Sequence, residues 1–348
     1  MGIESLAKTA LIAIPDIGSG HAAVAHALAT ELSSENNSIG VLTLSSGWLT
    51  VAKTYHLIMT SDAETSINYI DQGKKTRNGF WTNWLVDQLT KELTTHSQVT
   101  VITSQDHVAK AARRADKKVI HFHPDSHPKA EYNDSQHHVL TWVGPTGNHH
   151  SQTLVSPIDL LKAFKSPEVT PNRSEIWIKL SGSGGDPTVV KQIVHSFKKQ
   201  NQPVRLVAPD FFGAMGATRF SEAQYYHSVA KAPQQVICFP SEQIMFLAQQ
   251  SNSIYPPSVI SFYPRGEHEL NNLAEAITQG LTHAIICPLT LQTKLASHLA
   301  AKSIPPDLYR FIAPNKVSSA DFVSAERWDF PPEAIPIAQA IIALIAQA

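Results

Sequence analysis

Short apolar runs alternate with segments of helical spacing along most of the chain. Runs of strand type fall at residues 11–14, 38–44, 99–103, 118–122, 138–143, 175–180, 204–208, 258–262 and 284–288. Helical spacing is found at residues 22–32, 78–93, 107–115, 187–199, 241–250 and 270–280. Strands that alternate with helices are typical of parallel sheets built from βαβ units. The pattern therefore predicts an α/β protein.

The alternation stops once and then starts again. Residues 144–172 carry turn dipeptides and four prolines, and a new strand, glycine turn and helix follow. We therefore expect an N-terminal domain at 1–150, a linker at 151–172, a C-terminal domain at 173–331 and a terminal helix at 332–348. Both domains are predicted to be Rossmann-like and doubly wound, and to face each other across a cleft that holds a small molecule.

The first strand runs into a glycine turn, Gly18-Ser19-Gly20, and then into His21 at the mouth of a helix of small residues. The N-terminus of such a helix presents free N–H groups and a positive dipole, which suit a phosphate or a carboxylate. An imidazole at this place could move protons near neutral pH. The turn lacks the third glycine of a dinucleotide fingerprint, so nicotinamide binding is disfavoured.

Composition narrows the choice of function. The chain has 348 residues, of which 43% are hydrophobic. Its formal net charge is −1, so no global electrostatic field attracts it to nucleic acid. Its two cysteines, Cys238 and Cys287, lie in apolar strand-like contexts, which predicts buried free thiols in a reducing compartment. The start of the chain shows no leader pattern, and we therefore expect a cytoplasmic protein.

Two interpretations fit the helix predicted at 78–93. Its apolar residues Phe80, Trp81, Trp84, Leu85 and Leu89 share one side, and basic residues precede it. Such a helix rests on an anionic membrane surface or packs on the protein core, and core packing is the favoured interpretation.

Seven histidines lie between His121 and His150. His121 and His123 point to the same side of a predicted strand, as two metal ligands would. No cysteine joins them and their spacing matches no standard site, so no bound metal is expected.

Four motifs occur in the order found in one enzyme family. They are Gly18-Ser19-Gly20-His21, the segment Pro124-Asp125-Ser126-His127-Pro128, the turn at residues 181–185, and Arg265-Gly266 followed by Asn271, Asn272 and Glu275. The chain resembles the GT-B glycosyltransferases, and within them the group of the peptidoglycan lipid N-acetylglucosaminyltransferase and the diacylglycerol glycosyltransferases. The sequence departs from this pattern at Tyr263-Pro264, which precedes Arg265, and at the inserted Glu267-His268-Glu269.

The resemblance implies a nucleotide-sugar donor, expected to be UDP-linked, and no other cofactor. Glu275 would accept hydrogen bonds from the ribose hydroxyls. The diphosphate would be held by backbone N–H groups of Gly182, Ser183, Gly184 and Gly185 and by the helix start with Asn271 and Asn272, while Arg265 and Gly266 would lie against the leaving group.

The acceptor would bind to the N-terminal domain, at Gly18, Ser19, Gly20, Trp81 and Trp84. His21 is the candidate base for its hydroxyl, and Asp125 or His127 is a rival base or orients His21. A lipid or lipid-linked acceptor would bring peripheral membrane contact. The alternatives are a UDP-sugar epimerase of the same fold and a non-catalytic nucleotide-sugar-binding partner.

Overall fold

The computed structural model divides the chain into two compact units, and neither unit is continuous in sequence. Unit 1 comprises residues 1–53, 76–165 and 329–348, and unit 2 comprises residues 54–75 and 166–328. The chain changes unit at 53/54, 75/76, 165/166 and 328/329, which makes four passages. The structure describes residues 10–15, 19–34, 39–44, 64, 67, 68, 70, 71, 80–97, 100–122, 134–141, 151–156, 159–160, 176–179, 186–202, 204–208, 234–236, 258–259, 261–264, 267–278, 280, 283–321, 323–324 and 333–347.

Unit 1 is built on a parallel sheet. Its strands are β1 (Leu11–Pro15), β2 (Gly40–Leu44), β3 (Thr100–Thr103), β4 (Lys118–His121), β5 (His137–Thr141), β6 (Ser151–Ser156) and β15 (Ile335–Pro336). Their order in space is β15-β6-β5-β4-β3-β1-β2, and every pairing is parallel. The predicted α/β class is confirmed.

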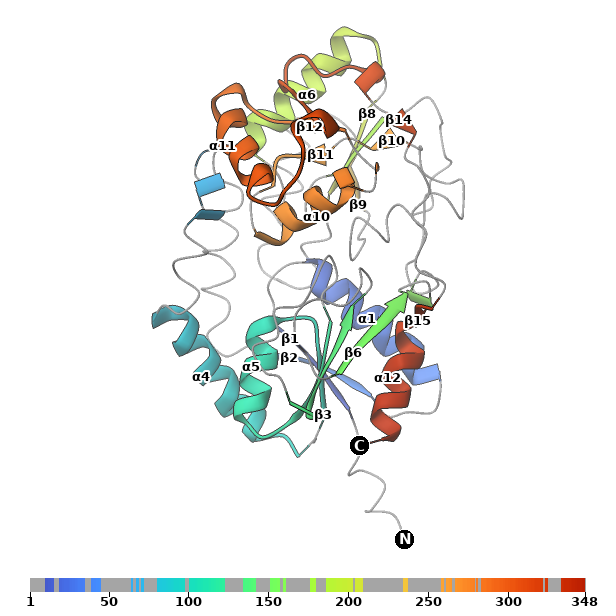
Figure 1. Ribbon diagram of the computed structural model, residues 1–348. Coiled ribbons are helices and arrows are strands. Elements are labelled where there is room, and N and C mark those ends of the chain that lie inside the picture. The colour runs from blue at the N-terminus through green and yellow to red at the C-terminus, as the bar shows by residue number, and fades with distance from the viewer. Residues whose placement is uncertain are drawn as a thin grey trace. The chain divides into compact units, whose positions relative to one another are not determined.

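Helices cover both faces of this sheet, because alternate residues of each strand point to opposite sides. Ile12, Ile102 and Ile120 pack against α1 (Ser19–Ser34) and α12 (Ile337–Ala346). Leu11 and Val101 pack instead with α4 (Phe80–Thr94) and α5 (Asp106–Arg114). Figure 1 shows these helix pairs on either side of the sheet. Unit 1 is therefore doubly wound.

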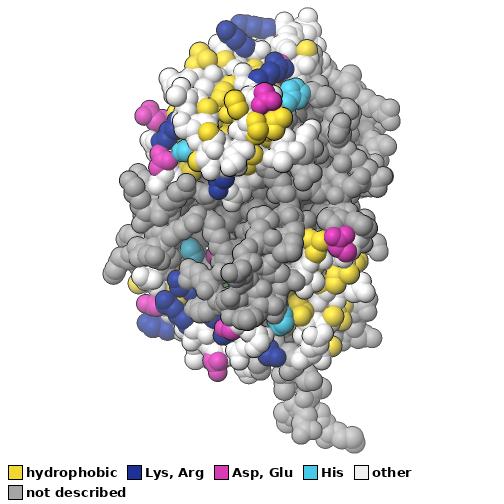
Figure 2. Space-filling view, in the orientation of Figure 1, with side chains coloured by type: hydrophobic (Ala, Val, Ile, Leu, Met, Phe, Trp, Pro, Cys, Tyr) yellow, Lys and Arg dark blue, Asp and Glu magenta, His cyan; other side chains and the backbone are white. Residues whose placement is uncertain are grey.

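The apolar C-terminal segment is used for packing. Ile337 and Ile341 of α12 are fully buried, and Ile342, Leu344 and Ile345 pack half-buried against the same cluster. Figure 2 shows apolar side chains gathered over this helix. In β15, which precedes the helix, Ile335 is 38% exposed. Across the described part of the chain, helices fall short of the length and apolarity that crossing a bilayer requires.

Asp159 holds the start of α12. The helix follows Pro336, which caps no N–H group, and the Asp159 Oδ2 atom accepts a hydrogen bond of 2.7 Å from the Ala338 backbone N–H. Burial raises the pKa of the Asp159 carboxyl, this bond opposes the rise, and nearby Glu31 adds to it. The folded protein therefore disfavours the charged form of this carboxyl while using its oxygen as a cap.

We expect mutation to separate the effect of the helix cap from the effect of burying a charged carboxylate. The Asp159→Ala variant loses the cap and about 1 kcal/mol of the free energy of unfolding. The Asp159→Asn variant keeps an acceptor oxygen and no longer buries a charge, so at pH 7 it is at least as stable as the wild type. A raised pKa stabilises the fold below the unfolded-state pKa, and this contribution is lost as the pH rises through the folded-state pKa. Denaturant unfolding of the wild type and both variants measures the free energy of unfolding between pH 3.5 and 7, a range that begins near the ordinary pKa of a carboxyl group. An Asn variant that is as unstable as the Ala variant would contradict the expectation.

Unit 2 contains several small sheets among its described residues. The strands β7 (Ile176–Lys179), β8 (Val204–Ala208) and β9 (Gln234–Val236) form one parallel sheet, with α6 (Pro187–Lys199) after β7. A second parallel sheet contains β11 (Ser261–Phe262), β12 (Ala284–Ile286) and β13 (Arg310–Ile312), with α10 (Glu267–Thr278) after β11 and α11 (Leu289–Ala300) after β12. The strands β10 (Ser258–Val259) and β14 (Val323–Ser324) pair antiparallel, and short 3₁₀ helices lie at Pro306–Leu308 and Ser319–Asp321.

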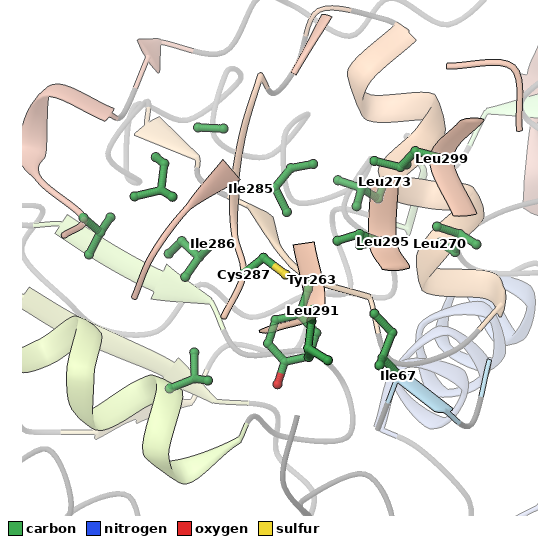
Figure 3. Close-up of a cluster of buried hydrophobic side chains, with 14 of the residues drawn as sticks. Ile67, Tyr263, Leu270, Leu273, Ile285, Ile286, Cys287, Leu291, Leu295 and Leu299 are labelled. Carbon is green, nitrogen blue, oxygen red and sulfur yellow. The ribbon is translucent and has the colours of Figure 1, made fainter. Parts of the chain in front are cut away.

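One hydrophobic core joins α6, α10 and α11 to the second sheet. Figure 3 shows its centre, where Ile285 and Cys287 lie among leucines of α10 and α11. Burial raises the pKa of the Cys287 thiol to about 12, so this cysteine is a buried free thiol, as expected. Cys238 lies outside the described residues.

The N-terminal half of the chain contributes to this core. Ile67 and Ile70 are 0% and 1% exposed and belong to the cluster, where Figure 3 labels Ile67. Asp71, next to them, lies 2.6 Å from Lys294 Nζ and 2.9 Å from His298 Nε2 on α11. The hydrogen bond from Lys294, reinforced by that from His298, lowers the pKa of the Asp71 carboxyl against the effect of burial. The described residues between 64 and 71, which we call the tether, are thus fixed to unit 2 by apolar and ionic contacts.

The Ile67→Ala substitution is expected to destabilise unit 2 by about 2–5 kcal/mol, because it leaves a cavity in a closed core. Hydrogen exchange should show faster exchange in α6 and α11 and unchanged protection in α4 and α5. Loss of protection in α4 and α5 instead would show that the tether belongs to unit 1. Leu308→Ala is the control, because Leu308 is 41% exposed and its truncation leaves little cavity.

Most element boundaries shift by a few residues, and four larger differences from the sequence predictions stand out. The helix after β1 begins at Ser19, not at residue 22, because Ser19 and Gly20 fit a first turn whose N–H groups need no helical partner. The predicted linker at 151–172 begins with strand β6, at Ser151–Ser156. The single strand predicted at 258–262 is two strands in different sheets. Helix α11, which was not predicted, follows β12 directly.

Candidate functional site

The strand order of unit 1 defines a switch point at β1. The chain moves from β1 to β2 on one side and then returns to place β3 on the other side, with Leu11 paired to both Gly40 and Val101. The connections that follow β1 and β3 therefore leave the carboxyl edge of the sheet in opposite directions. Open α/β sheets bind ligands in the crevice at such a point.

His21 lies at this switch point. It belongs to the first turn of α1, which follows β1, and its side chain is half-buried. Its Nδ1 atom lies 2.8 Å from the Oγ atom of Ser104, the first residue after β3. Ser104 is only 1% exposed. The hydrogen bond joins the two connections that diverge at the switch point.

The turn that carries Ser104 is held on three sides. The Thr103 hydroxyl donates a bond of 3.0 Å to the Ala13 carbonyl of β1 and accepts one of 3.1 Å from the Gln105 N–H. The Thr103 carbonyl accepts a bond of 3.1 Å from the Phe122 N–H, beyond the end of β4. Both neighbours of Ser104 are thus held by hydrogen bonds, which fixes the backbone from which its hydroxyl extends.

A buried polar chain lies on the other face of the same edge. Asp106 Oδ1 lies 3.2 Å from His121 Nε2, and His121 Nδ1 lies 3.2 Å from His137 Nε2. The two histidines are 0% and 2% exposed. His121 was considered above as a metal ligand together with His123, and no bound metal was expected; in the structure His121 lies beside Asp106 and His137, and His123 lies outside the described residues. No group suited to holding a metal ion occurs among the residues that the structure describes.

The remaining residues predicted for unit 1 divide into two sets. Ser19 and Gly20 lie in the first turn of α1, and Trp81 lies in the first turn of α4. Trp84 packs half-buried against the cluster that contains Leu85 and Leu89, as the core-packing interpretation expects for those three residues. Gly18, Asp125 and His127 lie outside the described residues.

In unit 2, α10 carries the described part of the predicted donor site. Tyr263 and Pro264, both buried, follow β11, and α10 begins at Glu267. Asn271 is half-buried, and helical spacing puts position 275 on the face that carries Asn271 and the exposed Thr278. The structure describes the backbone of Asn272 and Glu275 but not their side chains. Outside the described residues lie Gly182, Ser183, Gly184, Gly185, Arg265 and Gly266.

Sequence reasoning missed Ser104. The residue ends a buried strand, and polar residues at the carboxyl ends of parallel strands are candidates for a site. This signal was present, but the strand order that brings β3 beside β1 was needed to relate Ser104 to His21 across 83 positions.

No protein-family model matches the sequence, and comparison with curated protein sequences gives no match. Among solved structures, the chain is similar to MurG of Acinetobacter baumannii, with 14% identity over 98% of this chain and 100% of that one, at a TM-score of 0.40. It is similar to the spinosyn rhamnosyltransferase SpnG complexed with thymidine diphosphate, with 10% identity over 85% of each chain and a TM-score of 0.41. It is also similar to the UDP-GlcNAc 2-epimerase of Methanocaldococcus jannaschii, with 10% identity over 98% of this chain and 100% of that one, at a TM-score of 0.38.

Proposed function

We propose that this protein is a GT-B glycosyltransferase that moves a sugar from a nucleotide-diphosphate donor, UDP-linked, to an acceptor hydroxyl. The observation that carries the proposal is the hydrogen-bonded imidazole of His21 at the switch point of unit 1, where an open α/β sheet binds its ligand. The motifs that resemble those of the GT-B glycosyltransferases are the basis for proposing a nucleotide-sugar donor and a transfer reaction.

Unit 1 binds the acceptor in this proposal. His21 takes the proton of the acceptor hydroxyl as that oxygen attacks the anomeric carbon of the sugar. The bond between the anomeric carbon and the diphosphate oxygen breaks, and the nucleoside diphosphate leaves with the electron pair. Asp125 and His127 remain rival candidates for the base, because they follow β4 within a few positions in the sequence.

Unit 2 binds the donor. Glu275 accepts hydrogen bonds from the two ribose hydroxyls, and Asn271 shares its face of α10. The diphosphate lies against the backbone N–H groups of residues 182–185 and the start of α10, with Arg265 beside it. These groups meet the charge that grows on the leaving diphosphate, so the reaction needs no tightly bound metal.

The Glu275→Ala substitution is expected to weaken UDP binding about tenfold, because a diol bound by a carboxylate loses both of its hydrogen bonds. Isothermal calorimetry of the full chain with UDP measures the dissociation constant. The matched control is Glu333→Ala, which removes an exposed carboxylate from unit 1 and leaves UDP affinity unchanged. An unchanged affinity in the Glu275 variant would remove the ribose assignment.

The His21→Ala substitution is expected to lower transfer by about 10²–10⁴-fold and to leave UDP affinity unchanged, because it removes the base and not the donor site. The assay measures UDP released from UDP-glucose, UDP-galactose and UDP-N-acetylglucosamine with diacylglycerol vesicles and with soluble hydroxyl acceptors. Wild-type turnover in the His21 variant would transfer the role of base to Asp125 or His127, and their Ala variants distinguish the two.

The same assay tests the two alternatives. An epimerase converts a UDP-sugar to a second UDP-sugar without an acceptor, and product chromatography detects this. A non-catalytic partner binds UDP-sugars in the calorimeter and releases no UDP. Either result would overturn sugar transfer as the activity of this chain.

A further inference from the structure

One partner of the His21 ring is a hydroxyl inside the protein. Ser104 Oγ lies 2.8 Å from His21 Nδ1 and is held by a turn whose neighbouring residues are bonded to β1 and to the chain after β4. A group that is 1% exposed and fixed in this way has little freedom to turn toward another partner. The contact therefore restrains the orientation of the ring as well as its place.

A neutral imidazole carries its proton on one nitrogen and a lone pair on the other, and the partner of one nitrogen sets the role of the other. When Nδ1–H donates to the Ser104 hydroxyl oxygen, Nε2 holds the lone pair. When the hydroxyl donates to Nδ1, Nε2 carries the proton and cannot act as a base. Only the first arrangement permits proton abstraction by His21.

We propose that Ser104 is the positioning residue of His21: its hydroxyl oxygen accepts the Nδ1–H bond and so makes Nε2 the nitrogen that receives the acceptor proton. The inference rests on the proposed function. The hydrogen bond persists through the reaction, because Nδ1 still donates to Ser104 after Nε2 has gained the proton. Unlike a carboxylate, the hydroxyl holds the ring without adding a negative charge beside it.

The first test is spectroscopic and requires no substrate. Proton–nitrogen correlation spectra of the histidine rings report which nitrogen carries the proton, and the His21→Ala spectrum identifies the His21 signals among the 17 histidines. We expect the Nδ1–H form in the wild type and a shift toward the Nε2–H form in Ser104→Ala. A wild-type spectrum with the Nε2–H form, or no change in the variant, would overturn the proposal.

The second test is kinetic. In the UDP-release assay, Ser104→Ala is expected to lower kcat about tenfold with the donor KM unchanged, which corresponds to the net contribution of one hydrogen bond. Ser104→Thr keeps a hydroxyl and restores most of the rate. The double variant His21→Ala/Ser104→Ala is no slower than His21→Ala, since Ser104 acts only through His21.

Ser196→Ala is the matched control. Ser196 is also buried and its hydroxyl donates to the Val317 carbonyl, but it lies in unit 2. Its variant is expected to lower the melting temperature about as much as Ser104→Ala and to leave the His21 spectrum unchanged. An equal change of the spectrum in both variants would show a structural effect and overturn the proposal. If the spectra agree with the proposal and no UDP-sugar is turned over, the sugar-transfer function fails while the Ser104–His21 pairing stands.

Discussion

The pairing of β1 with two parallel neighbours is the constraint on which unit 1 depends. Leu11 and Ile12 pair with Gly40 and Val41 of β2 on one side and with Val101 and Ile102 of β3 on the other. A central strand of this kind is buried on both faces, and both α1 and α5 must cross over the sheet to return the chain. His21 and Ser104 lie together because the connections that follow β1 and β3 both start at the same edge of the sheet, before they diverge. The chemistry proposed for His21 is therefore a consequence of strand order.

The turn after β3 places polar side chains on both faces of the sheet. Ser104 contacts His21 on the side of α1, and two residues later Asp106 lies beside the buried His121 on the side of α5. A polar group buried in a protein costs free energy when it has no polar neighbour. A turn of three residues, 104–106, thus supplies one hydrogen-bond partner to His21 and one carboxylate beside His121, two histidines that are 100 positions apart in sequence. A change in this turn affects both.

Local patterns predicted much of the fold. The helix at Pro187–Lys199 and the strand at Val204–Ala208 were predicted to the residue, because Pro187 marks a first turn and Asp186 before it accepts bonds from Thr188 and Val189. Helix α11 was missed although Leu291, Leu295 and Leu299 recur every four residues, since its first residues also alternate as a strand does. The assignment of Ser258–Val259 and Ser261–Phe262 to different sheets could not be predicted, because it depends on which distant strand each of them pairs with.

Because of the tether, the chain cannot be divided into its two units by one cut in the sequence. Residues 54–75 belong to unit 2 although they lie inside the sequence of unit 1, and β15 and α12 belong to unit 1 although they follow unit 2. A gene divided at residue 165 would yield an N-terminal product without its outer strand and last helix, and a C-terminal product without Ile67 and Ile70. The two halves of the sequence are therefore not exchangeable units, and a chimaera with another protein would have to exchange the three segments of unit 1 together or the two segments of unit 2 together.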